Sequence, residues 1–327
     1  EKMAAALSAR LSMSRASVPL APLRAAGLPS AGAMPQRPAV AEIVIIDAPR
    51  LPGRPDDPRP LVAASAEPWP PHVDVYAGDA AQGLYRRVRI ETPSVIGRLT
   101  APLAPGPVGR WDLAASLEVE MSEPALASRS RLSVLAGANA LLVETDAGWE
   151  MLTFSHAALT GARSYRLTGL LRGLQGSDVA AGRGAAAGAQ VVLVDAALAR
   201  ADLGDHEIGV ALDWRAGLDG APFSVTLSNA QALAWKPAHL RLVAENDELM
   251  LAWSPRGPQR SDNWELPDVR LDETFEIEWT SDTGEIELQA VEGTRTSLPE
   301  SPGSARVRQI GADGRAGPWS SILSMNR

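Results

Sequence analysis

Arg172 is the residue of this chain whose surroundings first suggest chemistry. It lies in SYRLTGLLRGLQGSD, residues 164–178, where an alternating, strand-like run meets a turn with a glycine-rich tail. A guanidinium at such a turn can hold a phosphate or a carboxylate of a ligand, because its planar donors match both groups. Alternatively, the arginine and its glycines serve only the architecture of the turn, since glycine supplies the backbone freedom that tight turns need.

Glu118 and Glu120 are the candidates for a pair of catalytic carboxylates. They lie two residues apart in LEVEM and therefore on one face of a strand. Glycosidases use two acids that are about 5–9 Å apart. The alternation of apolar and acidic residues is also the pattern of a strand with one face in water, and we favour this interpretation.

Two further catalytic or cofactor patterns are incomplete. No G-x-S-x-G elbow is present to expose the serine of a Ser-His-Asp triad. GRGAAAG, residues 182–188, resembles part of a phosphate-binding loop, but it precedes the strand-like AQVVLVD. A dinucleotide site needs its glycines between a strand and a following helix. We therefore predict a hairpin loop at GRGAAAG, no cofactor and no enzymatic activity.

The composition argues against several other kinds of site and partner. The chain has no cysteine, which excludes disulfides, thiolate zinc sites and cysteine nucleophiles. It has four histidines, no two of them within thirty residues, which excludes a helical HExxH-type metal pair. The net charge of −8 argues against a nucleic-acid partner. No apolar run approaches the roughly 20 residues of a membrane helix, so we expect no membrane insertion.

Three regions follow from the distribution of strand and turn signals, and together they predict a mainly β, multidomain protein. Residues 1–38 are typical of a helix end and a Pro/Ala-rich linker from an upstream domain. Residues 39–232 hold short strand-like runs bounded by turn residues, which predict an antiparallel β-sandwich or barrel-like region. Within it, DAALARADL (195–203) is the one predicted helix. Residues 233–327 carry six or seven short strands, which predict an immunoglobulin-like sandwich.

A long connection in the last region carries the predicted surface-recognition residues. SPRGPQRSDNWELPDVRLDET is long for a loop within a sandwich, and such loops are often functional. An aromatic side chain among hydrogen-bonding groups suits recognition of a sugar or a protein surface. The predicted contact residues are Trp264, Arg256, Arg260, Asp262, Glu265 and Asp268. In the alternative interpretation, Trp264 folds back to cap the sandwich and the charged groups are only solvated.

Two segments of the chain resemble known families. ARVRQIGADGRAGPWSSI resembles the last hairpin of a fibronectin type III domain, with Ala305 at the place of that family's tyrosine. The tyrosine-corner hydrogen bond is therefore missing, which makes this a divergent member. GPVGRWDLAASLEVEM and GANALLVE…GWEMLTFSHAALTGARSYRLTGLLRGLQGSD resemble the C-terminal region of large tail proteins of siphophages and gene transfer agents. That family includes the baseplate "megatron", a host-specificity protein with a TIM-barrel-like domain, and the resemblance covers residues 40–327.

The resemblance to tail proteins implies a structural role at a tail tip. In that family the segment 164–178 forms a strand and a tight turn, so we expect Arg172 to pair with a neighbouring carboxylate or with backbone carbonyls. The chain would lie in the baseplate of a virion or gene transfer agent particle, assembled in the bacterial cytoplasm and extracellular after release. Its expected partners are other baseplate and tail hub proteins, further copies in a homotrimer, and a glycan or protein receptor on the host surface.

Two other functions stay open at this point. The chain could be an extracellular polysaccharide-active enzyme with an accessory fibronectin-like domain, in which case Glu118 or Glu120 would be needed for glycan turnover. It could also be a purely internal tail scaffold. In that case a Trp264→Ala change would leave adsorption to the host unchanged.

Overall fold

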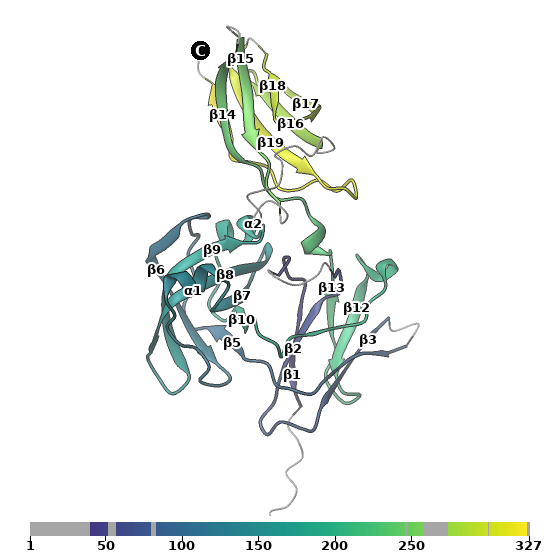
Figure 1. Ribbon diagram of the computed structural model, residues 1–327. Helices are drawn as coiled ribbons and strands as arrows, with labels where there is room; N and C mark the ends of the chain where they lie inside the picture. The colour runs from purple at the N-terminus through teal and green to yellow at the C-terminus, as the bar shows by residue number, and fades with distance from the viewer. Residues whose placement is uncertain are drawn as a thin grey trace, which may run out of the picture. The chain divides into compact units, whose positions relative to one another are not determined.

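The protein is mainly β, and its sheets are antiparallel (Figure 1). The computed structural model describes residues 40–51, 57–79, 83–245, 248–257, 274–299 and 301–325. The chain splits into two compact units, residues 1–37 and residues 38–327, and all described residues belong to the second unit. The boundaries predicted at residues 38 and 232 stay predictions.

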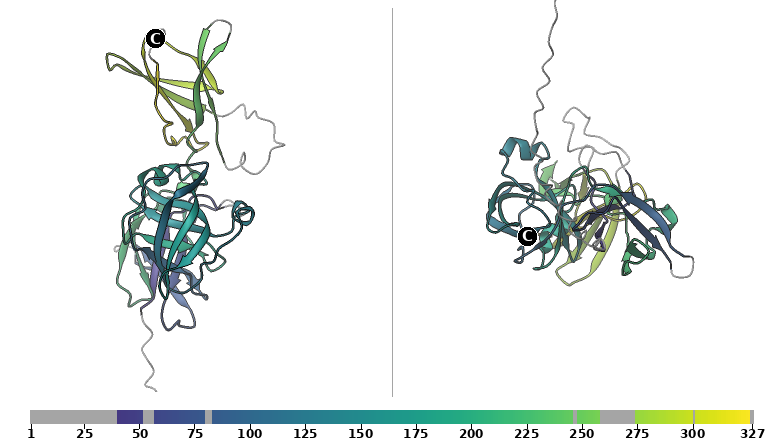
Figure 2. Two further views of the ribbon diagram at one scale, coloured as in Figure 1. Left: turned by 90° about the vertical axis from the view of Figure 1, so that its left-hand side faces the viewer. Right: turned by 90° about the horizontal axis from the view of Figure 1, so that it is seen from below.

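A closed six-stranded barrel lies in the middle of the chain. Its strands are β5 (Ile96–Leu99), β6 (Trp111–Met121), β7 (Ala140–Thr145), β8 (Gly148–Leu159), β9 (Ser164–Leu174) and β10 (Gln190–Leu193). They close in the order β10-β5-β6-β9-β8-β7, and the longest of them face the viewer in the left view of Figure 2. One apolar cluster lies among these strands, and it includes Leu117, Val119, Leu141, Phe154, Leu167 and Val191. The barrel is therefore a packed core and not a channel.

A three-stranded sheet packs against the barrel with one face. Its strands are β1 (Glu42–Ile46), β2 (Leu61–Ser65) and β11 (Ala199–Arg200), in the order β1-β2-β11. Val44 and Ile46 of β1 join a core cluster with Ile96 and Val192 of the barrel. Alternate residues of β1 and β2 point the other way. The sheet is therefore a middle layer that is buried on both faces.

The second face of this middle layer packs on a four-stranded sheet. The strands of that sheet are β13 (Phe223–Thr226), β12 (Ala211–Ala216), β3 (Val73–Gly78) and β4 (Tyr85–Ile90), in this order. Their shared core contains Ile43, Val62, Val75 and the fully buried Trp214. Trp69 lies at the margin of this core and packs partly against it.

The C-terminal strands form two sheets around a separate core. One sheet has the order β14-β15-β18 and the other β17-β16-β19-β20. The strands are β14 (Ala238–Glu245), β15 (Glu248–Ser254), β16 (Thr274–Ser281), β17 (Ile286–Glu292), β18 (Arg295–Ser297), β19 (Gly303–Ile310) and β20 (Leu323–Met325). Trp253 and Phe275 meet in the core edge to face, with ring centroids 5.3 Å apart. This is the β-sandwich that the strand pattern predicts for the last region.

Helices are short, and the helix predicted over residues 195–203 is wrong. The Asp195 side chain accepts a hydrogen bond from the Ala197 N–H at 2.9 Å, which makes a turn, and β11 (Ala199–Arg200) then pairs with β2. The helices are α1 (Arg131–Leu135), α2 (Asp178–Arg183), η1 (Asp205–Glu207) and η2 (Ala230–Ala232). GRGAAAG begins in the last turn of α2 and leads into β10, so it connects a helix to a strand and is not a hairpin loop. In the described part of the chain, no helix has the length and apolar character needed to cross a membrane.

Candidate functional site

A cleft lies beside Trp69. Its volume is about 650 Å³. It is lined by Val40, Glu42, Ser65, Ala66, Glu67, Trp69, Pro93, Ser94, Ser122, Glu123, Pro124 and Arg163. These residues come from the ends of β1 and β2, from the turns before β5 and after β6, and from the turn between β8 and β9. The cleft therefore exists only because the middle sheet packs against the barrel.

The Trp69 ring is held in place within this cleft. Its indole N–H donates to the Glu91 carbonyl oxygen at 3.2 Å, and its ring packs partly on the neighbouring core. Glu67 is exposed at the rim, with its Oε2 3.7 Å from Nη1 of Arg163. Glu123 is also exposed at the rim. A fixed aromatic ring beside carboxylates and hydroxyls is a surface on which a hydroxyl-rich ligand such as a sugar can stack and hydrogen-bond.

Trp69 is not among the residues that the sequence marks as candidates for recognition. The available signal was an aromatic residue between prolines in EPWPP. Prolines restrict the backbone there, so the ring needs little further ordering to present a surface. The partners of the ring come from distant segments, and sequence spacing could not have brought them together.

The structure confirms that Arg172 pairs with a neighbouring carboxylate and with a backbone carbonyl. Both it and Glu150 are fully buried. Arg172 Nε donates to Glu150 Oε1 at 2.5 Å, Nη2 donates to Oε2 at 2.7 Å, and Nη1 donates to the Ala104 carbonyl oxygen at 3.1 Å. Gly173 also donates its N–H to Glu150 Oε1 at 3.1 Å. All of these donors lead to groups of the protein, so the pair joins β8 to β9 and to the segment before β6.

Glu118 and Glu120 lie on β6 as predicted. The surroundings of the two carboxylates differ from each other. Glu118 Oε1 accepts a hydrogen bond from Arg166 Nε at 2.5 Å across the β6–β9 ladder. Glu120 is exposed and lies opposite Ser164. The two acids are thus part of a solvated strand face.

Ser155 and His156 form a serine–histidine contact within β8. Ser155 Oγ lies 2.8 Å from His156 Nδ1, while Ser155 itself is 1% exposed. In the described part of the chain, no carboxylate reaches His156 to orient it as a catalytic triad requires. Among the same described residues, no three histidine, aspartate or glutamate side chains come together in a group that could hold a metal ion.

Arg256 is the one predicted recognition residue that the structure describes. Its Nη1 donates to Asp178 Oδ1 at 2.7 Å, and its Cζ lies 5.7 Å from the centroid of the Trp235 ring. Its side chain is 28% exposed. The other five, Arg260, Asp262, Trp264, Glu265 and Asp268, lie outside the described residues. The recognition role of this loop therefore stays a prediction.

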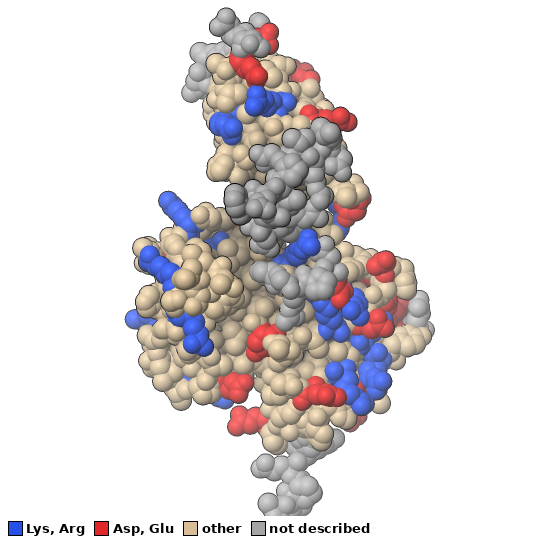
Figure 3. Space-filling model, in the orientation of Figure 1, with Lys and Arg blue, Asp and Glu red and all other residues tan. Residues whose placement is uncertain are grey.

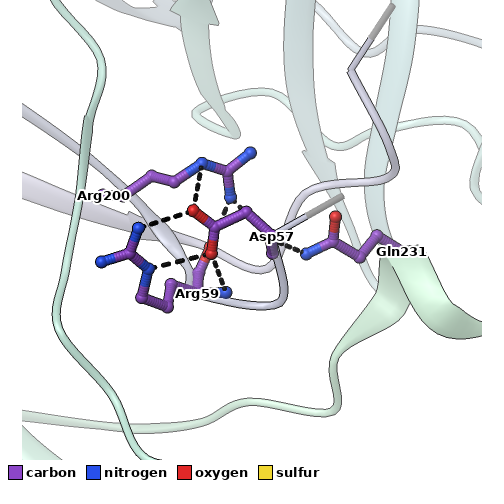
Figure 4. Close-up of polar contacts among 4 residues, drawn as sticks. All are labelled: Asp57, Arg59, Arg200 and Gln231. Atoms are coloured by element: carbon purple, nitrogen blue, oxygen red, sulfur yellow. Dashed lines mark hydrogen bonds and ion pairs between the residues drawn. The ribbon is translucent and has the colours of Figure 1, made fainter. Parts of the chain in front are cut away.

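Asp57 organises a polar cluster of residues that are distant in sequence (Figure 4). The Asp57 carboxylate accepts hydrogen bonds from Arg59 Nε at 2.9 Å and Nη2 at 2.7 Å, and Arg200 Nε lies 3.3 Å from its Oδ2. Gln231 donates its side-chain N–H to the Asp57 carbonyl oxygen. The hydrogen bonds from Arg59 outweigh the effect of burial and lower the pKa of Asp57 to about 2. The carboxylate is therefore a permanently charged structural link at neutral pH.

The comparison with protein families concerns the barrel. Residues 94–192 match the model described as Rcc01698-like, C-terminal. The match begins two residues before β5 and ends within β10, so it coincides with the closed barrel. The barrel is thus similar to the C-terminal region of Rcc01698-like proteins.

The other two comparisons add no argument. No curated protein matches the chain. A solved structure described as a cytokine receptor complex, crystal form 1A, aligns with a TM-score of 0.23 and 13% identity, over 64% of this chain and 90% of that chain. A similarity at this level supports no statement about fold or function.

Proposed function

We propose that this chain is a structural component of the baseplate or tail tip of a phage or gene transfer agent, and that it contributes to recognition of the host surface. The observation that carries the proposal is the Rcc01698-like match over residues 94–192, which coincides with the barrel. The same barrel holds the segments that resemble siphophage and gene transfer agent tail proteins. The proposed role is non-catalytic.

The C-terminal sandwich supports the proposal as an accessory module. It combines a three-stranded and a four-stranded antiparallel sheet, an arrangement that suits the resemblance to a fibronectin type III domain. Ala305 is buried on β19, opposite Trp279 of β16, at the position proposed to lack the family's tyrosine. Such modules present loops at a surface, and the loop predicted around Trp264 belongs to this region.

We propose that the cleft beside Trp69, together with the predicted loop containing Trp264, contacts a glycan or protein receptor on the host. Weak contacts of this kind give firm attachment when several copies engage one cell, as in the proposed homotrimer. The remaining partners would be other baseplate and hub proteins of the same particle.

The association with particles is tested by mass spectrometry of purified phage or gene transfer agent particles from the source cells. The proposal expects peptides of the barrel in intact particles, at a few copies relative to the major tail protein. A chain found only in the soluble fraction or the cell envelope would contradict the proposal. The enzyme with an accessory fibronectin-like domain would then become the leading interpretation.

A further inference from the structure

The short helix α1, on the outside of the barrel, presents apolar side chains to solvent. Its Val134 is 2% exposed, and the helix packs on β8. Leu132 and Leu135 are instead 79% and 65% exposed. Residues three or four apart are neighbours on a helix surface, so Leu135 lies beside both Leu132 and Arg131. The exposed side of α1 is therefore apolar with a basic residue at its start.

The start of β6 lies beside this helix and adds a third exposed leucine. The Cζ of Arg131 lies 5.1 Å from the centroid of the Trp111 ring, which places α1 against the start of β6. Side chains alternate between the two faces of a strand, and the exposure of the next two residues follows this pattern. Asp112 is 7% exposed, whereas Leu113 is 65% exposed. Leu113 therefore shares the outward face with Trp111.

Three arginines flank these leucines in the sequence, and all three are exposed. They are Arg110, Arg129 and Arg131. In the described part of the chain, no carboxylate lies within ion-pair distance of them. Asp112, the carboxylate nearest to Arg110 in the sequence, is turned inward and accepts two backbone N–H groups, at 3.1 Å and 3.0 Å. The three positive charges are therefore not neutralised by the protein.

Together these side chains form one surface. We call it the basic leucine patch, and it consists of Leu113, Leu132, Leu135, Arg110, Arg129 and Arg131. Figure 3 shows blue side chains without red ones over the part of the barrel where β6 and α1 lie in Figure 1. The whole chain has a net charge of −8, so the positive charge of this patch is a local feature. Exposed apolar groups that gather in this way mark interaction surfaces more often than scattered ones do.

We propose that the basic leucine patch binds the surface of a membrane that contains anionic lipids. The three guanidinium groups match the charge and the shape of lipid phosphates. The leucines would enter the boundary between the headgroups and the acyl chains, as the apolar side chains of membrane-surface proteins do. Nucleic acid would engage the arginines but would gain nothing from the leucines. A deformable lipid surface can surround side chains that protrude from the barrel.

This contact is peripheral and needs no membrane-spanning helix, because only side chains enter the lipid. It goes beyond the proposed function, which names a glycan or protein receptor, and it rests on the patch alone. The ordinary alternative is that the three leucines are isolated apolar residues of the kind found on most protein surfaces. That alternative predicts that the chain does not bind lipid.

Flotation of the full chain with lipid vesicles tests the proposal. The chain should bind phosphatidylcholine vesicles that contain phosphatidylglycerol about tenfold or more tightly than vesicles of phosphatidylcholine alone. High salt should weaken this binding because salt screens the charges. Arg129→Glu and Leu132→Asn should each weaken it by about fivefold or more. Both side chains are exposed, and thermal unfolding should show that both variants remain folded.

Two changes elsewhere on the surface are the matched controls. Arg183→Glu alters an exposed arginine that ends α2. Leu218→Asn alters a leucine that is 65% exposed in the turn after β12. Both variants should bind vesicles as the wild type does, because neither residue belongs to the patch.

A fluorescent label tests whether the leucines enter the lipid. The chain has no cysteine, so Leu132→Cys provides a single site for an environment-sensitive dye. Its emission should shift to shorter wavelength when anionic vesicles are added. The same dye on Leu218→Cys should show no shift, because that residue would stay in water.

Three results would overturn the proposal. Failure to bind anionic vesicles would do so and would leave an acidic protein surface as the candidate partner. Equal binding by the wild type and both patch variants would place the contact elsewhere, for example in residues 1–37, which hold five basic residues and one acidic residue. Tighter binding to duplex DNA than to vesicles, unchanged by Leu132→Asn, would assign the arginines to nucleic acid.

Discussion

The buried pair of Arg172 and Glu150 links β8 and β9 of the barrel to the segment before β6. Two charges removed from water are stable only when each satisfies the other, and here the guanidinium and the carboxylate form two hydrogen bonds. We predict that Glu150→Gln destabilises the protein by about 3–5 kcal/mol, because it leaves a buried charge without its partner. Urea unfolding followed by circular dichroism measures this.

A double replacement distinguishes the effect of the buried charges on stability from the effect of side-chain packing. Arg172→Met combined with Glu150→Leu removes both charges and should recover most of the stability lost in Glu150→Gln, since apolar pairs often replace buried ion pairs at little cost. A loss below about 1 kcal/mol for Glu150→Gln would show that the pair is not buried as described.

The lowered pKa of Asp57 predicts how the free energy of unfolding depends on pH. Its pKa is lowered from 3.8 to about 2, so the charged carboxylate favours the folded state. The contribution is fully present above the unfolded pKa and is lost as the pH falls from about 4 towards 2. Asp57→Asn should therefore flatten the decline of unfolding free energy within this window and leave its slope at neutral pH unchanged. An unchanged acid limb in the variant would refute the assignment.

Trp69 gives the residue-scale test of recognition. Loss of an aromatic anchor weakens binding by about tenfold in typical interfaces. We predict that Trp69→Ala reduces binding of the purified chain to host cells by about this factor, while Trp69→Phe retains most of it because a ring remains. Thermal unfolding of both variants controls for the part of Trp69 that packs on the core. Equal binding by wild type and Trp69→Ala would remove the cleft from the proposal.

At the scale of elements, glycines shape the turn between β9 and α2. Gly173 and Gly176 have positive φ angles of 62° and 82°, as expected from the sequence. A Cβ at Gly176 would lie 2.6 Å from the Trp235 ring. We predict that Gly176→Ala costs about 2 kcal/mol or more, from backbone strain and from this clash.

Gly182 is the matched control for this change. It lies in α2, where a Cβ meets open space. Gly182→Ala should therefore be neutral or slightly stabilising, because alanine favours helix. Equal losses in the two variants by urea unfolding would contradict the structural role of the Gly176 turn.

The sequence predicted where individual strands lie better than it predicted which strands pair with each other. Strand-like runs such as SYRLTGLL form β9, which continues through Arg172 to Leu174, so the turn predicted at Arg172 begins later, and Gly176 lies in it. Closure of the barrel depends on β10 pairing with both β5 and β7, which are far from it in sequence, and no local pattern specifies that. The error at DAALARADL has a similar cause. Its alanines favour a helix, but pairing with β2 and burial of Leu198 determine the structure.

The same limit applies to the candidate site. The sequence predicted a recognition loop around Trp264, because the charged and aromatic residues of this segment are adjacent in the sequence. The cleft beside Trp69 is formed by segments from Val40 to Arg163, and only the packing of the middle sheet on the barrel brings them together.

At the scale of the whole molecule, the proposed tail component combines a barrel, a sheet that is buried on both faces, and a C-terminal sandwich. The proposed location of the chain is the tail tip. Immunogold electron microscopy of released particles, with antibody raised against residues 233–327, tests this location. We predict label at the tip of intact tails. Label confined to cell envelopes or soluble protein, with unlabelled tails, would contradict it.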